Sequence, residues 1–238
     1  MYETLENFET ELSPNGVLLL RMNRAPVNAL SVPFKEEIIH LFDYISEDER
    51  VKVVTLTGNG RIFCAGADLN ERSGIGRAGG EYRAQNRITR EAFHAIEECT
   101  KPVISAVDGA AIGAGVGLAC SADIVLCSNT AYFLMPEIKV GLAGGASRLA
   151  QLFPPSLAKY AYYAAEPIPA STLEKYGAVL EVVEQADLVY HAQEIAEQIA
   201  AMDTEMLSRA KQTFALTDGM ESRKAYRYEQ SITLSLAN

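Results

Sequence analysis

The most informative stretch of this sequence is KPVISAVDGAAIGAGVGLACSADIVLCSN, residues 101–129. Its two apolar ends, 101–109 and 123–129, are rich in β-branched residues and predict strands. The glycine- and alanine-rich segment between them predicts a helix over about 113–122. A strand, a helix and a second strand in this order are typical of parallel strands joined by a helical crossover.

The same alternation extends toward the N-terminus. GVLLLRMN (16–23) and VKVVTLTG (51–58) predict strands, and the segment between them, 33–48, has apolar residues at helical spacing. A further helix is expected over 80–99. After about residue 147 helical patterns dominate, including a long helix over 187–201. The sequence therefore predicts an α/β protein with a mainly parallel sheet and a helical C-terminal region.

Composition narrows the class of protein. The 238 residues are 48% hydrophobic and 22% charged, which is typical of a globular protein, and the formal net charge of -10 argues against nucleic acid or an anionic membrane as the main partner. The sequence has no apolar run of about 18 residues and no signal-peptide pattern, so we expect a cytoplasmic protein. Four cysteines without paired spacing (Cys64, Cys99, Cys120 and Cys127) are expected to be reduced packing residues, and no metal site is predicted.

Two segments rich in small residues are candidates for a ligand site. RIFCAGADLNE (61–71) follows a strand, and its small residues allow a ligand to approach the backbone. DGAAIGAGVGLACSAD (108–123) places glycines at the start of a helix, where backbone N–H groups lack partners within the helix. It contains neither GxGxxG nor a P-loop, which argues against nucleotide binding. A tight turn and close helix–strand packing remain the structural alternatives.

A third segment, AYFLMPEIKVGLAGGASRL (131–149), contains Glu137 within an apolar run. A charged group is costly there unless it is paired or functional. Since burial raises the pKa of a carboxyl group, such a glutamate can transfer protons near neutral pH. The structural alternative is an ion pair with Lys139 or Arg148.

Four segments together, NRAPVNAL (23–30), FCAGADL (63–69), 101–123 and MPEIKVGL (135–142), resemble the crotonase superfamily, the enoyl-CoA hydratase/isomerase group. The resemblance implies a ββα spiral core over residues 1–190 that binds an acyl-CoA thioester. It also implies a C-terminal helical trimerisation region over 191–238, in a homotrimer or homohexamer. No cofactor beyond the coenzyme A moiety of the substrate is expected.

The resemblance also assigns site residues. The backbone N–H groups of Ala67 and Ala114 correspond to an oxyanion hole that holds the thioester enolate. Residues expected near CoA are Arg24, Ala25, Ala65, Lys211 and Phe214. On an amphipathic helix, however, the last two are usually a solvated stem and a core anchor.

One departure from the family affects the expected reaction. Hydratases of this family carry a glutamate three residues after the second oxyanion amide, where this sequence has Gly117. With Glu137 as the one retained carboxylate, isomerisation is the most economical reaction. The alternatives are a C–C lyase, decarboxylase or synthase, a hydratase in which Glu71 or Glu81 replaces the missing acid, and a non-catalytic acyl-CoA-binding protein.

The segment 71–87 lies at a place where members of the family vary. It is either a solvated loop or part of the acyl pocket, with Tyr82 and Arg83 as candidate contacts beside Gly117. The loop GLAGGASRL (141–149) lacks the proline that the family often has, which predicts a reshaped pocket wall. The histidines His40, His94 and His191 are expected to be packed or solvated rather than catalytic.

Overall fold

A six-stranded sheet lies at the centre of the computed structural model, which describes residues 2–72 and 79–235. In spatial order its strands are β1 (Phe8–Leu12), β2 (Val17–Met22), β3 (Val53–Gly58), β5 (Val103–Val107), β7 (Ile124–Ser128) and β10 (Glu181–Val183). The β1–β2 pair is antiparallel and the later pairs are parallel. The predicted mainly parallel sheet is therefore confirmed. The edge strand β1 (FETEL) was not predicted because three of its five residues are acidic or polar.

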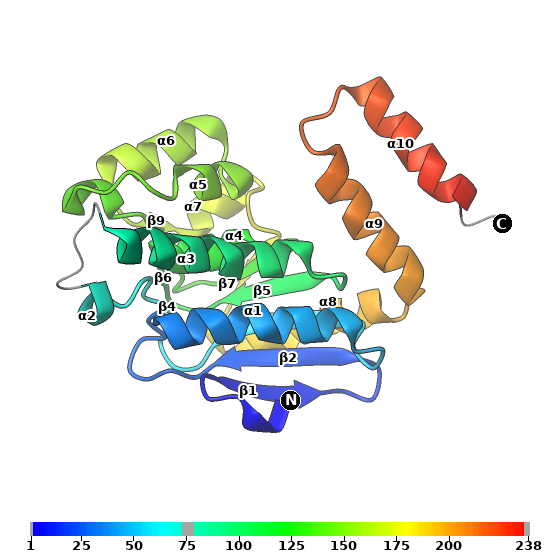
Figure 1. Ribbon diagram of the computed structural model, residues 1–238, viewed down its shortest axis with the longest axis horizontal. Helices are drawn as coiled ribbons and strands as arrows, with labels where there is room; N and C mark the ends of the chain where they lie inside the picture. The colour runs from blue at the N-terminus through cyan, green and yellow to red at the C-terminus, as the bar shows by residue number, and fades with distance from the viewer. Residues whose placement is uncertain (1, 73–78, 236–238) are drawn as a thin grey trace.

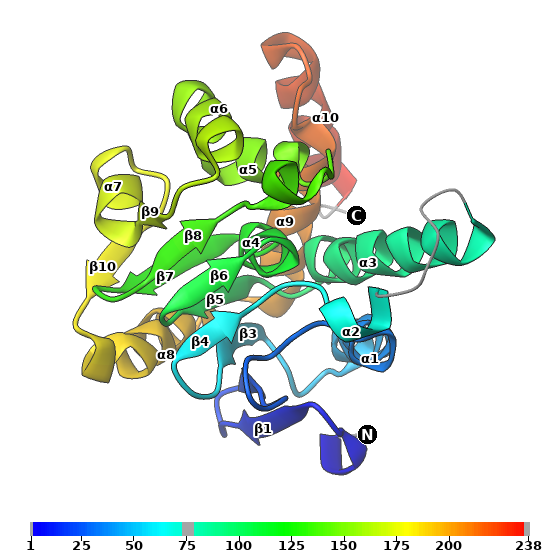
Figure 2. The same ribbon diagram turned by 90° about the vertical axis from the view of Figure 1, so that its left-hand side faces the viewer.

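A second, four-stranded sheet consists of β4 (Ile62–Cys64), β6 (Ala110–Ile112), β8 (Tyr132–Leu134) and β9 (Ile168–Pro169). Each consecutive pair β3/β4, β5/β6 and β7/β8 places one strand in each sheet, so the chain winds through three similar turns. Figure 2 shows the β4, β6 and β8 strands as a layer beside the larger sheet. This winding is the ββα spiral that the resemblance implies.

Helices follow the strand pairs and cover the spiral. They are α1 (Val32–Glu47), α2 (Leu69–Arg72), α3 (Gly80–Glu98), α4 (Ala114–Cys120), α5 (Ala146–Leu152), α6 (Pro155–Ala164) and α7 (Ala170–Lys175), with 3-10 turns at Tyr2–Thr4, Glu137–Val140 and Gln185–Asp187. Helix α1 begins where the Ser31 hydroxyl accepts a hydrogen bond from Phe34 N at 3.2 Å. Its predicted apolar face, which includes Phe34 and Ile45, is buried.

Helix α8 (Leu188–Ala200) packs on the large sheet. Its buried face consists of Leu188 and three alanines at four-residue spacing, which contact Val17, Val53 and Ile104 among other sheet residues. Alanine side chains let the helix axis approach the strands closely. The expected boundary between residues 190 and 191 falls inside this helix, so the core continues to Ala200.

The last two helices, α9 (Thr204–Thr217) and α10 (Ser222–Ser235), stand apart from the rest of the chain (Figure 1). Lys211 on α9 anchors the first of them. Its ammonium group lies 2.9 Å from Asp123 Oδ2 and donates to the carbonyl oxygens of Lys101 at 3.1 Å and Ile96 at 3.3 Å. These three oxygens match the three N–H donors of a lysine.

All four cysteines are buried and free, as expected, and burial raises the pKa of the Cys64 and Cys120 thiols to about 12.

Over residues 2–72 and 79–235, no helix combines the length and apolar character needed to cross a membrane.

The Lys211 contact gives the first prediction. Lys211→Met leaves the Asp123 carboxylate and two carbonyl oxygens without their donor, so we expect the free energy of unfolding to fall by about 2 kcal/mol or more. Chemical denaturation measures this change, and limited proteolysis should show earlier cleavage in α9. Lys224→Met, at an exposed position of α10, is the control and should leave both unchanged. Equal effects of the two variants would contradict the anchor role.

Candidate active site

The segment after β4 carries the first group of the candidate site. Backbone hydrogen bonds tie it to residues 27–30: Ala65 N donates to Val27 O at 3.0 Å and Leu30 N to Gly66 O at 2.8 Å. Asp68 N donates to Leu30 O at 3.2 Å. Leu30 and Ala67 thus form a parallel β-bridge. The Ala67 N–H lies between Gly66 O and Asp68 N, which are bonded to Leu30, and takes no part in these three hydrogen bonds. The Ala67 N–H is therefore available to a ligand.

The start of α4 carries the second group. Its N-cap residue, Gly113, provides no side-chain hydrogen bond, and Ala114 is the first helical residue. The first N–H groups of a helix have no acceptor within the helix, so the Ala114 amide is also available.

Glycines bring these two backbone segments into contact. A Cβ atom on Gly66 would lie 2.5 Å from Ile112 O and 3.3 Å from Ala114 N. A Cβ atom on Gly115 would lie 2.2 Å from Cys64 O. Real Cβ atoms do not approach backbone oxygens so closely, so only glycine allows the present packing at both positions. The contact holds the segment that contains Ala67 against the start of α4.

A cavity of about 520 Å³ opens beside the two amides. Its walls come from the β4 end, from α3, from the start of α4 and from residues 135–148. The predicted site residues Ala65, Ala67, Tyr82, Ala114, Gly117 and Glu137 all line it. Residues from the loop 141–149 also line it, so this loop does form a wall of the pocket, as expected.

Glu137 opens a 3-10 turn directly after Pro136, and its carboxylate lies over the start of α4. A Cβ atom on Gly113, the residue before Ala114, would lie 2.7 Å from Glu137 Oε1. The charge of Glu137 reaches Tyr162: burial and, secondarily, this charge raise the pKa of the Tyr162 phenol. Among the described residues that line the cavity, Glu137 is the only carboxylate.

The two cations that could pair with Glu137, Lys139 and Arg148, each form an ion pair with another carboxylate. Lys139 Nζ lies 3.0 Å from Glu166 Oε1, and Arg148 pairs with Glu97. Lys139 and Arg148 thus each pair with a carboxylate other than Glu137. Glu137 instead belongs to the cavity.

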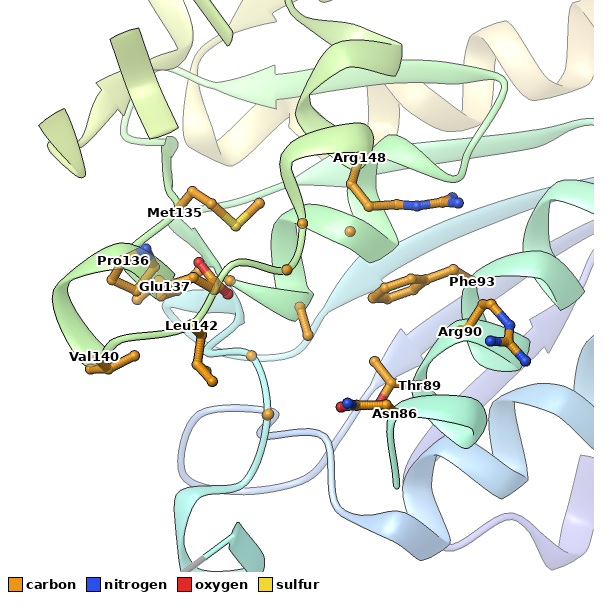
Figure 3. A pocket seen from close by; sticks show the side chains of 18 of the residues that line it. Asn86, Thr89, Arg90, Phe93, Met135, Pro136, Glu137, Val140, Leu142 and Arg148 are labelled. Atoms are coloured by element: carbon orange, nitrogen blue, oxygen red, sulfur yellow. The ribbon is translucent and has the colours of Figure 1, made fainter. Parts of the chain in front are cut away.

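Across the cavity from Glu137 lies the Phe93 ring of α3, and the two side chains point into the space from opposite sides (Figure 3). The ring tip lies on Gly117, where a Cβ atom would be 2.5 Å from Phe93 Cζ. The guanidinium carbon of Arg148 lies 5.6 Å from the ring centroid. Phe93 is 8% exposed and belongs to the hydrophobic core.

Three predicted contacts do not lie at the cavity. Arg83 is exposed and is absent from the lining, although its helical phase is close to those of the lining residues Asn86 and Arg90. Glu81 is likewise exposed, whereas Glu71 accepts a hydrogen bond from Val32 N at 2.7 Å at the start of α1. Neither glutamate is among the described residues that line the cavity. Residues 73–78 of the predicted variable loop lie outside the described residues.

Sequence reasoning missed the α3 residues Asn86, Thr89, Arg90, Phe93 and His94, which line the cavity together with Tyr82. Their spacing from Tyr82 is that of one helical face, and extending that spacing along 80–99 would have found them. His94 was expected to be packed or solvated, yet it lies at the cavity.

The residues that the resemblance assigns to CoA binding differ in their contacts and their exposure. Arg24 lies outside the cavity lining, 3.0 Å from Asp68 Oδ2, and donates to Ala29 O at 2.9 Å. Ala25 beside it is exposed. Lys211 is saturated by its three oxygen partners, so a role in CoA binding does not fit its surroundings in this chain. Phe214, by contrast, is 80% exposed, so the lysine is the anchor and the phenylalanine the solvated residue.

Among residues 2–72 and 79–235, no group of three or more His, Cys, Asp or Glu side chains is arranged to hold a metal ion.

Comparisons with known proteins agree with this geometry. A family model described as enoyl-CoA hydratase/isomerase matches residues 13–236. A curated protein from Rhodococcus jostii RHA1, (7aS)-7a-methyl-1,5-dioxo-2,3,5,6,7,7a-hexahydro-1H-indene-carboxyl-CoA hydrolase, is 34% identical over 93% of this chain and 86% of its own length. Carnitinyl-CoA dehydratase of Escherichia coli K12 is 31% identical over 92% of this chain and 85% of its own length. The crystal structure of an enoyl-CoA hydratase from Bacillus anthracis superposes with a TM-score of 0.90 at 30% identity, covering 95% of this chain and 89% of that one.

The glycine contact predicts a specific stability difference. Gly66→Ala combines a positive φ of 88° with a close contact, so we expect the free energy of unfolding to fall by about 3 kcal/mol or more. Gly60→Ala is the control, because Gly60 also has a positive φ but has no heavy atom within 4 Å of its Cβ position. It should cost only about 1 to 2 kcal/mol. Equal losses in chemical denaturation would show that the backbone contact is not the constraint.

Proposed function

This chain belongs to the enoyl-CoA hydratase/isomerase family, and we propose that it transfers a proton within an enoyl-CoA thioester through an enolate, with Glu137 as the acid/base. Ala67 N–H and Ala114 N–H polarise the thioester carbonyl in this proposal. A preorganised donor of this kind is worth about 3 to 4 kcal/mol of transition-state stabilisation in other enzymes. The amides are suited to this role because the surrounding backbone holds them in place and leaves them available.

One observation carries the choice of reaction: the described lining of the cavity contains a single carboxylate, Glu137, beside the Ala114 amide. Isomerisation needs only one such group. Glu137 removes a proton from C2 of a 3-enoyl thioester, the electrons form a dienolate, and the same carboxyl group returns the proton to C4. The product is a 2-enoyl thioester, and no other reactant is consumed. Hydration needs a base and an acid on the water, and the second carboxylate is missing.

The CoA moiety is proposed to extend from the cavity past Ala65 toward Arg24 and Ala25. Ala65 lines the cavity, and Arg24 contacts both the segment that holds Ala67 and residues 27–30, through Asp68 and Ala29 respectively. Arg24 therefore offers a positive charge near the Ala67 end of the site. The proposed reaction requires no cofactor beyond the CoA of the substrate.

A second candidate reaction is hydrolysis of a C–C bond in a CoA-linked ketone. The name of the Rhodococcus relative, a hydrolase of a dioxo-indene carboxyl-CoA, favours it. Here Glu137 takes a proton from water, the hydroxide adds to a C3 ketone, and the C2–C3 bond breaks. Its electrons pass to a thioester enolate at the same two amides, and C2 takes the proton. The products are a carboxylic acid and a shortened acyl-CoA.

The acid/base role predicts the behaviour of Glu137→Gln. This variant keeps the side-chain shape but removes the titrating group, so turnover should fall by about 10²-fold or more while acyl-CoA binding is retained. Exchange of the C2 proton of a 3-enoyl-CoA for deuterium, followed by NMR, measures dienolate formation in the isomerase reaction, whereas deuterium at C2 of the cleaved product measures the hydrolase reaction. Glu166→Gln is the control, because Glu166 is an exposed carboxylate paired with Lys139. Full exchange in Glu137→Gln would exclude Glu137 as the base.

Product analysis separates the two candidate reactions. A 3-enoyl-CoA that is converted to its 2-enoyl isomer supports the isomerase, and a cyclic β-keto-acyl-CoA that opens to a carboxylic acid supports the hydrolase. If the wild type binds acyl-CoA but neither exchanges the C2 proton nor converts either substrate, the protein is an acyl-CoA-binding module rather than an enzyme.

We also propose that the chain forms homotrimers or homohexamers through α9 and α10. Both helices expose large apolar side chains, including Phe214 at 80%, Tyr226 at 62% and Leu234 at 68%. Burying such side chains between subunits would be favourable. Light scattering should therefore give three or six times the chain mass, and Phe214→Glu should lower that mass. A monomeric wild type would contradict the proposal.

A further inference from the structure

The wall of the cavity opposite Glu137 is unusual because an aromatic ring fills the space that a side chain at position 117 would need. A Cβ atom at residue 117 would lie 2.5 Å from Phe93 Cζ and 2.9 Å from each Cε atom. Real Cβ atoms essentially never come so close to other heavy atoms. The Phe93 ring and a side chain at position 117 therefore cannot both occupy this space.

Several contacts hold the ring in this position. Phe93 is 8% exposed, and the Arg148 guanidinium carbon lies 5.6 Å from its centroid. Arg148 is fixed in turn by its ion pair with Glu97, whose Oε1 also accepts a hydrogen bond from Gln151 Nε2 at 2.9 Å. The ring is thus a fixed part of the wall, supported from α5 as well as α3.

The position of Gly117 on α4 relates the ring to the proposed substrate. Gly117 follows Ala114 by three residues, so the two lie on one side of the helix and about 4.5 Å apart along its axis. Both line the cavity. An acyl group whose thioester oxygen is bound at the Ala114 amide therefore has its next carbons, C2 to C4, beside the ring.

From this placement we infer that Phe93 determines which reaction the site supports: its ring keeps water and a second acid/base side chain away from the α4 side of the acyl group. The inference rests on the proposed function. Hydration of a 2-enoyl thioester adds the water oxygen to C3 and a proton to C2, and it needs one group that takes a proton and another that gives one. With the ring in place, position 117 of α4 cannot supply such a group.

A first experiment tests the contact without any substrate. Gly117→Ala is made in the wild type and in a Phe93→Ala background, and chemical denaturation gives the four stabilities. We expect Gly117→Ala to lower stability in the wild type and to have little or no effect once the ring is removed. An equal loss in both backgrounds would overturn the inference, whatever reaction the protein catalyses.

A second experiment tests the effect on the reaction. Phe93→Ala, Gly117→Glu and the double variant are compared for formation of 3-hydroxybutyryl-CoA from crotonyl-CoA. The double variant, in which the new carboxylate has room, should form this product about 10²-fold faster than Phe93→Ala alone. Gly117→Glu alone should not gain this activity. The combination of Gly117→Glu with Phe153→Ala is the control, because it removes a buried ring that lies elsewhere.

The outcomes separate this inference from the proposed function. A folded double variant that binds crotonyl-CoA but hydrates it no faster than Phe93→Ala would overturn the role of the ring and leave the Glu137 result untouched. Equal hydration by Gly117→Glu with and without the ring would overturn it as well. If Glu137→Gln keeps full C2 proton exchange, the proposed function fails, whereas the stability cycle at Phe93 and Gly117 still reports on the contact.

Discussion

The close approach of two backbone segments is the constraint on which the rest of the site depends. The parallel pairing of β4 with β6 aligns the ends of two turns of the spiral, and Gly66 and Gly115 remove the side chains that would hold those ends apart. The amides of Ala67 and Ala114 then face one cavity. Glu137 reaches the same place because Gly113 has no Cβ atom in its way. Three glycines thus position every proposed reacting group.

The cavity has walls of two kinds. Near the two amides the wall is backbone, fixed by hydrogen bonds to residues 27–30 and by strand pairing. Across the cavity the wall consists of side chains from one face of α3, with Phe93 at its most buried point. The carbonyl of an acyl-CoA would meet the first wall, and the remainder of the acyl group would meet the second. Binding of the thioester and selection of the acyl group are therefore assigned to different elements.

Much of the fold could be predicted from the sequence, because long elements carry periodic patterns: the strands at 16–23, 51–58, 101–109 and 123–129 and the helix at 33–48 are present. Strands β4, β6 and β8 have three residues each, which is too short for a pattern. At the site, Glu137 stood out as a charge in an apolar run. Arg83 has nearly the helical phase of the lining residues Asn86 and Arg90, so the direction of its exposed side chain, which no sequence pattern carries, keeps it out of the lining. The roles of Lys211 and Phe214 were reversed because partners more than 100 residues away saturate the ammonium group.

The side-chain wall on α3 also affects how such a protein can diversify. Its cavity-facing residues come from one helix, which also packs against α1, where Lys35 Nζ donates to the Thr89 hydroxyl at 3.4 Å. Codon changes at these positions can alter the acyl group accepted without moving the amides that bind the carbonyl. The backbone wall, in contrast, depends on glycine at positions 66, 113 and 115, where a Cβ atom would meet a neighbouring atom at 2.7 Å or less.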